Sequence, residues 1–262
     1  MEENHVFPLP AASFDGESRE VDPGACFDWL RQGWVMFIEH PAIWLGCSTI
    51  MLLSLLLTML VMTPVFVILV GAMYGALLGQ AVMSVLLPIF AAGLLSVCKV
   101  QSSGEGSPTI PLVLSGFRER LVPLLIVGIL FSIATFGLAS IAFMIVSGDL
   151  LGDVVTGRVG GVAIAIGTVM LASVLVFLLS LPVIMATWFA PALIYLNGMS
   201  PLAAMRASFG AGAKNWLTVG VFGSLLMIAL FALLPMLLGM VIFLPIFSGA
   251  VYASYRDIFV GT

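Results

Sequence analysis

The sequence predicts an all-α integral membrane protein: a bundle of six transmembrane helices, arranged as three hairpins with short interfacial helices on the cytoplasmic side. Two observations predict this class. Of the 262 residues, 61% are hydrophobic and only 8% are charged, whereas an average soluble domain has about 25% charged residues. The charges are also missing from four long runs of the chain. This composition excludes a soluble enzyme, a disordered chain and a secreted disulfide-rich protein.

The uncharged runs cover residues 40–98, 121–148, 159–205 and 215–255. A helix needs about 20 residues to cross ~30 Å of hydrocarbon, so the second run holds one span and each of the others has room for two. Because proline lacks an N–H and clashes with the preceding helical turn, we place turns at Thr63-Pro64 and Leu234-Pro235. The predicted spans are residues 42–62, 65–97, 121–148, 159–195, 216–233 and 236–257.

The segment 159–197 is interpreted either as one long helix kinked at Pro182 and Pro191 or as a broken one. If it crosses the membrane once, the chain has six spans and both termini lie on the same side. Eight Lys and Arg residues then lie on that side, and Arg158 alone lies on the other. Because Lys and Arg mark the cytoplasmic side, both termini are predicted to be cytoplasmic. Five or seven spans would remove this asymmetry.

The N-terminal segment differs from the rest of the chain. Residues 1–28 contain seven carboxylates, one Arg and no early apolar core, so they do not resemble a cleavable signal peptide. We predict an acidic, disordered cytoplasmic tail over residues 1–21 and a six-helix transmembrane domain over residues 22–262.

Three segments on the predicted cytoplasmic side resemble one another. Each begins with Asp or Ser before Pro, continues to a small residue followed by an aromatic one, and ends with Pro or Asn five residues before Gly. They are Asp22-Pro23, Gly33-Trp34, Pro41 and Gly46; Ser107-Pro108, Gly116-Phe117, Pro123 and Gly128; and Ser200-Pro201, Ser208-Phe209, Asn215 and Gly220. Asp or Ser before Pro is a typical helix start. We interpret a threefold repeat of an interfacial helix and a two-span hairpin, the alternative being chance similarity at the membrane boundary.

Some residues are expected to pack or anchor the helices. Gly71, Gly75 and Gly79 form a GxxxGxxxG line, which favours close packing within the bundle or, alternatively, against a second copy. Gln80 is the candidate buried polar contact, expected to bond across helices rather than to bind a substrate. Aromatic and basic residues at the predicted boundary are interpreted as interfacial anchors. These anchors are Trp29, Trp34, Trp44, Trp216, Tyr252, Tyr255 and Arg256.

The sequence shows little reactive chemistry. No ionisable side chain lies near the middle of a predicted span, so ion-coupled transport is not indicated. The histidines and cysteines lack metal-ligand spacing, and Asp149 and Asp153 are expected in a solvated loop. We therefore predict no enzyme activity and no catalytic, cofactor-binding or metal-binding residue. The nine basic residues are too scattered to indicate nucleic-acid binding.

The motifs in and around the three segments are similar to a known pattern. They are Phe189-Ala190-Pro191-Ala192-Leu193, Pro201, Ala204-Met205, Ser208-Phe209 and Asn215-Trp216, with Gly33-Trp34, Phe37, Pro41, Trp44, Gly116-Phe117-Arg118 and Tyr255-Arg256-Asp257-Ile258-Phe259. Over residues 22–259 the chain resembles a family of uncharacterised six-span proteobacterial inner-membrane proteins, the BPSS-type hypothetical membrane proteins. The resemblance implies an all-helical fold in the bacterial inner membrane and implies no reaction.

Two functions are compatible with these observations. The first is a non-catalytic subunit, assembly factor or scaffold of a membrane complex, whose partners are membrane lipids and another membrane protein or a second copy. The alternative is a transporter or channel for a small neutral or amphipathic solute or for lipid. A lipid-sized apolar cavity reaching Gln80 would favour the alternative, and a solid bundle would argue against it.

Overall fold

The computed structural model describes residues 17–104, 106–156, 161–233 and 237–261. Within these ranges the regular structure is entirely helical. Five helical segments are long and apolar enough to cross a membrane, and the predicted class, an all-α membrane bundle, is confirmed. Residues 1–16 of the predicted tail, Arg158 and the predicted turn at Leu234-Pro235 lie outside the described residues.

The helices form three successive units, each with a short first segment and a hairpin. The first unit comprises α1 (Ala25–Glu39), α2 (Pro41–Val70) and α3 (Ala72–Ser103). The second comprises the 3₁₀ helix η1 (Ile110–Leu114), α4 (Ser115–Glu119), α5 (Leu121–Thr156), α6 (Gly161–Trp188) and α7 (Ala190–Asn197). The third comprises α8 (Pro201–Lys214), α9 (Trp216–Leu233) and α10 (Leu237–Phe259).

The junction between the short segment and the hairpin has similar backbone geometry in all three units. One residue interrupts the helix each time: His40 (φ −135°, ψ 57°), Arg120 (φ −138°, ψ 32°) and Asn215 (φ −109°, ψ 33°). These residues leave the helical region of φ/ψ space, so the chain changes direction and then continues as a helix. This geometry supports three similar units, although the landmarks Pro41, Pro123 and Asn215 lie at different distances from the break.

The three units interlock in a ring, because each short segment packs on the second hairpin helix of the unit before it. α1 packs on α10, η1 and α4 pack on α3, and α8 packs on α6. The contacts are equivalent as well. A Cβ added to Gly33 would overlap the Ile246 carbonyl oxygen, and one added to Gly116 would overlap that of Ile89. At the third position, Ser208 Oγ donates a hydrogen bond of 2.6 Å to a carbonyl oxygen of α6.

The repeat is also visible in the second hairpin helices. Pro-Ile-Phe occurs at residues 88–90 of α3 and at residues 245–247 of α10. In each case the isoleucine is the residue on which the glycine of the next short segment packs. This pair lies inside the apolar runs, where many sequences look alike, so the structure is needed to show that the two copies are equivalent.

The helix boundaries correct one predicted turn and decide between the two interpretations of the segment 159–197. α2 continues through Pro64 and the hairpin turns at Gly71, which has φ 89°, a conformation that glycine adopts without steric cost. α6 continues through Pro182 and breaks at Phe189, so the segment 159–197 is a broken helix. Proline is tolerated in membrane helices because neighbouring groups satisfy the freed backbone. A proline in an apolar run therefore does not by itself locate a turn.

Two further expectations were wrong. Ser107-Pro108 does not start a helix, because η1 begins at Ile110. Asp149 and Asp153 lie within α5, which runs to Thr156, and not in a loop. In contrast, α9 has the predicted bounds, and α8 begins at Pro201 after Ser200 as expected.

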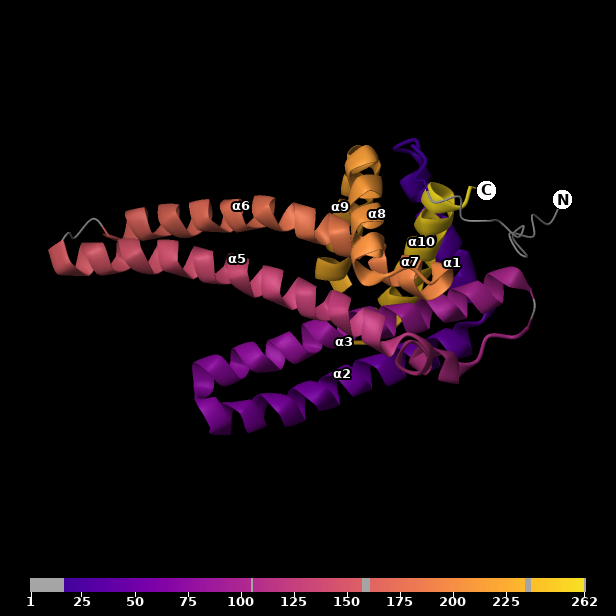
Figure 1. Cartoon of the computed structure of the whole chain (residues 1–262), viewed down its shortest axis with the longest axis horizontal. Helices are drawn as coiled ribbons and strands as arrows, with labels where there is room; N and C mark the ends of the chain where they lie inside the picture. Colours follow the sequence, from indigo (N-terminus) through magenta and orange to yellow (C-terminus); the bar gives the residue numbers. More distant parts are fainter. Residues whose placement is uncertain (1–16, 105, 157–160, 234–236, 262) are drawn as a thin grey trace.

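Figure 1 shows a compact part from which the hairpins α2–α3 and α5–α6 extend in the same general direction, with their far ends apart. We call the compact part the base; it comprises the short segments, α7 and the C-terminal halves of α3 and α10. The two ends of the described chain meet there, since the Arg19 amide donates to the Ile258 carbonyl at 2.7 Å.

Candidate functional site

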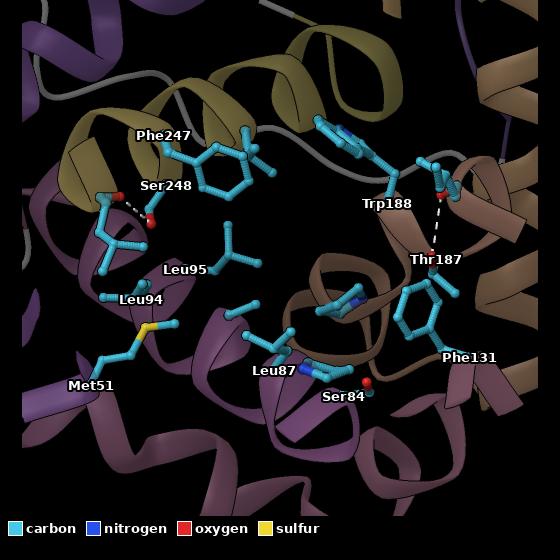
Figure 2. Close-up of a pocket in the computed structure, with 16 residues that line it drawn as sticks. Met51, Ser84, Leu87, Leu94, Leu95, Phe131, Thr187, Trp188, Phe247 and Ser248 are labelled. Carbon is cyan, nitrogen blue, oxygen red and sulfur yellow. Dashed lines mark hydrogen bonds between the residues drawn. The ribbon is translucent and has the colours of Figure 1, made fainter. Parts of the chain in front are cut away.

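A cavity of ≈ 440 Å³ lies between the second helices of the three units, close to the base (Figure 2). Cavities of about 300–1,000 Å³ are typical of small-molecule sites. α3 contributes Ser84, Leu87, Pro88, Ala91, Leu94 and Leu95; α6 and α7 contribute Ile184, Thr187, Trp188 and Pro191; α10 contributes Leu244, Phe247, Ser248 and Val251. Met51 of α2 and Phe131 of α5 complete the lining. The cavity therefore lies on the axis of the repeat.

The wall of this cavity is apolar. Its three hydroxyl groups each donate to a carbonyl oxygen of their own helix: Ser84 to Gln80 (3.0 Å), Thr187 to Val183 (2.8 Å) and Ser248 to Leu244 (2.7 Å). A hydroxyl that bonds back to the preceding turn no longer offers its proton to a ligand. The remaining side chains are aliphatic or aromatic, so the cavity suits hydrocarbon.

A hydrogen-bonded floor separates the cavity from the outer side of the base. Tyr252 follows the lining residue Val251, and its hydroxyl is 2.8 Å from Ser102 Oγ on α3. Tyr255, one turn further, donates to Asn197 Oδ1 at the end of α7 at 2.6 Å. Two tyrosines of α10 thus join this helix to α3 of the first unit and to α7 of the second. Both tyrosine side chains are buried.

A second buried polar group joins the first unit internally. Gln101 lies near the end of α3; its Oε1 accepts from Trp44 Nε1, and its Nε2 donates to the Met36 carbonyl and to Glu39, each at 2.9 Å. The side chain therefore contacts α1 and α2 at the same time. Because buried amides are costly unless paired, these bonds determine how the helices around His40 are oriented.

The start of the described chain docks on the third unit. Asn215 accepts from the Val21 amide at 2.8 Å and donates to the carbonyl of Arg19 at 2.8 Å, and Thr218 donates to the Val21 carbonyl at 3.0 Å. Residues 18–21 were assigned to the disordered tail. The structure instead gives them backbone partners, and their bonds cover the junction between α8 and α9.

The predicted interfacial anchors fall into two groups. Trp34 and Trp216 are exposed, 49% and 64% respectively, as an anchor requires. The others are buried in the base and correct the prediction: they are Trp29, Trp44, Tyr252, Tyr255 and Arg256. Their polar atoms find partners inside the protein, as Trp29 Nε1 does by donating to Asp257 at 2.9 Å. An aromatic residue beside a membrane boundary also suits a helix contact, and only the tertiary structure distinguishes the two.

The three glycines of the GxxxGxxxG line do not share one packing role: Gly71 forms the hairpin turn, and Gly75 and Gly79 pack against α2. Gly71 is the hairpin turn and has no atom within 4 Å of an added Cβ. A Cβ on Gly75 would overlap the backbone of Val67, and one on Gly79 would overlap the Thr63 side chain. These contacts lie within the α2–α3 hairpin and do not form a face toward a second copy.

Gln80 is exposed and does not line the cavity, so its assignment as a buried contact was wrong. Among the described residues, the buried side-chain amides are those of Gln101 and Asn215. The sequence indicates Asn215, because this residue is a landmark of the repeat. Gln101 lies at the edge of a charged loop, and no sequence feature indicates it. Trp188 lies at the end of an apolar run, and no sequence feature indicates it either.

Within the described residues, no group of three or more His, Cys, Asp or Glu side chains is placed to hold a metal ion. Comparisons with protein-family models, with curated proteins and with solved structures find no match. The resemblance to the six-span inner-membrane family therefore stays a prediction.

Proposed function

We propose that this protein is a six-span protein of the bacterial inner membrane, with both termini in the cytoplasm, that binds a lipid acyl chain in its central cavity without catalysing a reaction. The observation that carries this proposal is the apolar cavity between the three hairpins. Each CH₂ group transferred from water to such an environment contributes about 0.8 kcal/mol. From within a bilayer the gain is smaller, so the shape of the cavity would select the ligand.

The topology is supported by the position of the charges. α10 (Leu237–Phe259) corresponds to the sixth predicted span, and in this proposal it crosses the membrane in addition to the five segments named above. With six crossings the base lies at the cytoplasmic end of the bundle, because it holds the ends of the described chain and the basic residues Arg31, Lys99, Arg118, Arg206 and Lys214. The floor of the cavity then faces the cytoplasm, and the hairpins extend through the bilayer.

Lipid retention tests the proposal. The protein is purified in dodecyl maltoside, exchanged extensively, and analysed for lipid per protein by native mass spectrometry. In the Ala91→Phe variant the new ring occupies the cavity, so we expect retained lipid to fall well below that of the natural protein. Ala139→Phe, at an exposed position of α5, is the matched control and retains lipid. The proposal would be contradicted if Ala91→Phe retained as much lipid as Ala139→Phe, or if the natural protein retained no lipid.

A component of a larger membrane complex is the second candidate, and one observation favours it. Outside its contacts with α5 and α8, α6 exposes large apolar side chains, including Met170, Leu171, Val174, Phe177 and Leu178. An apolar helix face without a neighbour contacts either lipid or another protein's helix. Photo-crosslinking from position 177 in native membranes distinguishes the two: a discrete protein adduct supports a complex, and lipid adducts alone argue against it.

A further inference from the structure

The ring of three units has three seams, each between the second helix of one unit and the first hairpin helix of the next. In the first seam α5 packs along α3, and in the third α2 packs along α10. In the second seam, the described residues of α9 make no comparable contact with α6. The threefold arrangement is therefore broken at one place, between α6 and α9.

Two glycines that lie at the same distance from the helix break of their unit show the same difference. Gly128 lies eight residues after the break at Arg120, and a Cβ added to it would be 2.6 Å from the Val85 carbonyl oxygen of α3. Gly223 lies eight residues after the break at Asn215, and no atom is within 4 Å of its added Cβ. The glycine of the second unit thus lies against α3 in the first seam, whereas the glycine of the third unit faces open space.

Trp188 bridges the second seam at the end nearest the base. The centroid of its ring lies 6.2 Å from the ring centroid of Phe222 on α9 and 6.2 Å from that of Phe247 on α10, and both ring pairs are edge to face. Trp188 also lines the cavity (Figure 2). The same side chain thus faces the cavity and spans the gap between the second and third units.

The indole N–H of Trp188 is buried and has no hydrogen-bond partner among the described residues. A buried donor without a partner is costly, by about 1–3 kcal/mol. Edge-to-face ring contacts hold the side chain in place without satisfying this donor. The ring is therefore held less firmly than Trp29 and Trp44, whose indole nitrogens donate to Asp257 and Gln101.

From these observations, and resting on the proposed function, we infer that the seam between α6 and α9 is the lateral route by which a lipid acyl chain passes from the bilayer into the cavity, and that Trp188 restricts this route. The occupant is a lipid chain because the seam is continuous with lipid-facing side chains of both helices, such as Leu178 and Leu179 on α6 and Ile228 on α9. The floor of Tyr252 and Tyr255 closes the other direction.

The route is tested by the rate at which the cavity fills. Purified protein in dodecyl maltoside is mixed with phosphatidylglycerol carrying a diazirine on one acyl chain. Samples are irradiated at intervals, and adducts on the peptides containing Met51 and Phe131 are quantified by mass spectrometry. Both residues line the cavity but lie on helices that do not border the second seam, so adducts there report arrival.

Gly223→Leu places a side chain in the open space, and we expect adducts to form about tenfold more slowly with an unchanged final amount. Gly137→Leu is the matched control, because Gly137 of α5 also has nothing within 4 Å of its added Cβ, and we expect the natural rate. Trp188→Ala removes the restriction, and we expect faster filling.

Equal rates in Gly223→Leu and Gly137→Leu, with cavity adducts in both, would overturn the lateral route and leave the proposed function in place. A Trp188→Ala variant that fills no faster than the natural protein would also overturn the role given to the indole. If the natural protein forms no adduct at Met51 or Phe131, the proposed function itself fails, and the route with it.

Discussion

The base and the membrane hairpins are built from similar amino acids but are held together in different ways. In the base, backbones approach closely at Gly33 and Gly116, and buried side chains bond between helices. In the hairpins, α5 packs along α3 and α2 packs along α10, but α9 makes no comparable contact with α6, and many large apolar side chains of these two helices are exposed. The base thus has buried polar bonds between its helices, whereas the hairpins rely mainly on apolar packing, which is least extensive between α6 and α9.

The largest expected effect comes from separating two units of the base. Gly116→Val would overlap the Ile89 carbonyl oxygen, and such overpacking against a backbone that cannot yield costs about 3 kcal/mol or more. We expect a large fall in the midpoint of thermal unfolding, followed by tryptophan fluorescence in detergent. Gly210→Val, at a position of α8 with open space around it, is the control and keeps the natural midpoint. If both variants unfold alike, close approach at Gly116 does not hold the units together.

A smaller effect is expected from a buried amide of the base. Gln101→Leu leaves the Trp44 indole N–H and the Met36 carbonyl without their partner, which costs about 1–3 kcal/mol. Gln80→Leu makes the same chemical change in the hairpin, where the side chain is exposed, and the unfolding midpoint is expected not to fall. A loss of stability in Gln80→Leu equal to that of Gln101→Leu would contradict the difference between the two regions.

Within the base, the docked N-terminal segment depends on one side chain. Asn215→Ala removes the bonds to the Val21 amide and the Arg19 carbonyl, at a cost of about 1–2 kcal/mol. We expect faster hydrogen exchange of the amides of residues 19–22, with little change in the helices of the hairpins. The exchange is measured by mass spectrometry. Unchanged exchange at these amides would show that the docking does not depend on Asn215.

The smallest effect is expected at the tip of a hairpin. Gly71→Ala places a Cβ on a residue with φ 89°, a strain of about 1 kcal/mol, in a turn far from the base. We expect the distribution of distances between spin labels on α2 and α3 to broaden, while the midpoint of thermal unfolding changes little. A fall in the midpoint as large as that of Gly116→Val would mean that the hairpins and the base unfold as one unit.

The sequence predicted the helices better than their ends. α9 has its predicted bounds. α2, in contrast, continues past Pro64 and ends before Gly71. In lipid, backbone groups must be satisfied within the protein, so the helix continues through the first proline and does not turn there. The repeat was detectable because its landmarks lie in polar segments, where chance similarity is lower. The cavity was not predictable, because Leu95, Val251 and the lipid-facing leucines are the same kinds of residue in the same apolar runs.

Composition and the position of the charges were enough to establish a helical membrane protein, because these properties depend on the solvent around each segment. They could not decide which boundary tryptophan is exposed, as Trp34 is, and which is buried, as Trp29 is. Nor could they show that the ring is packed at the first and third seams and open at the second, between α6 and α9. Those outcomes depend on contacts between residues far apart in the chain, such as Trp29 with Asp257, and only the packing of all three units creates them.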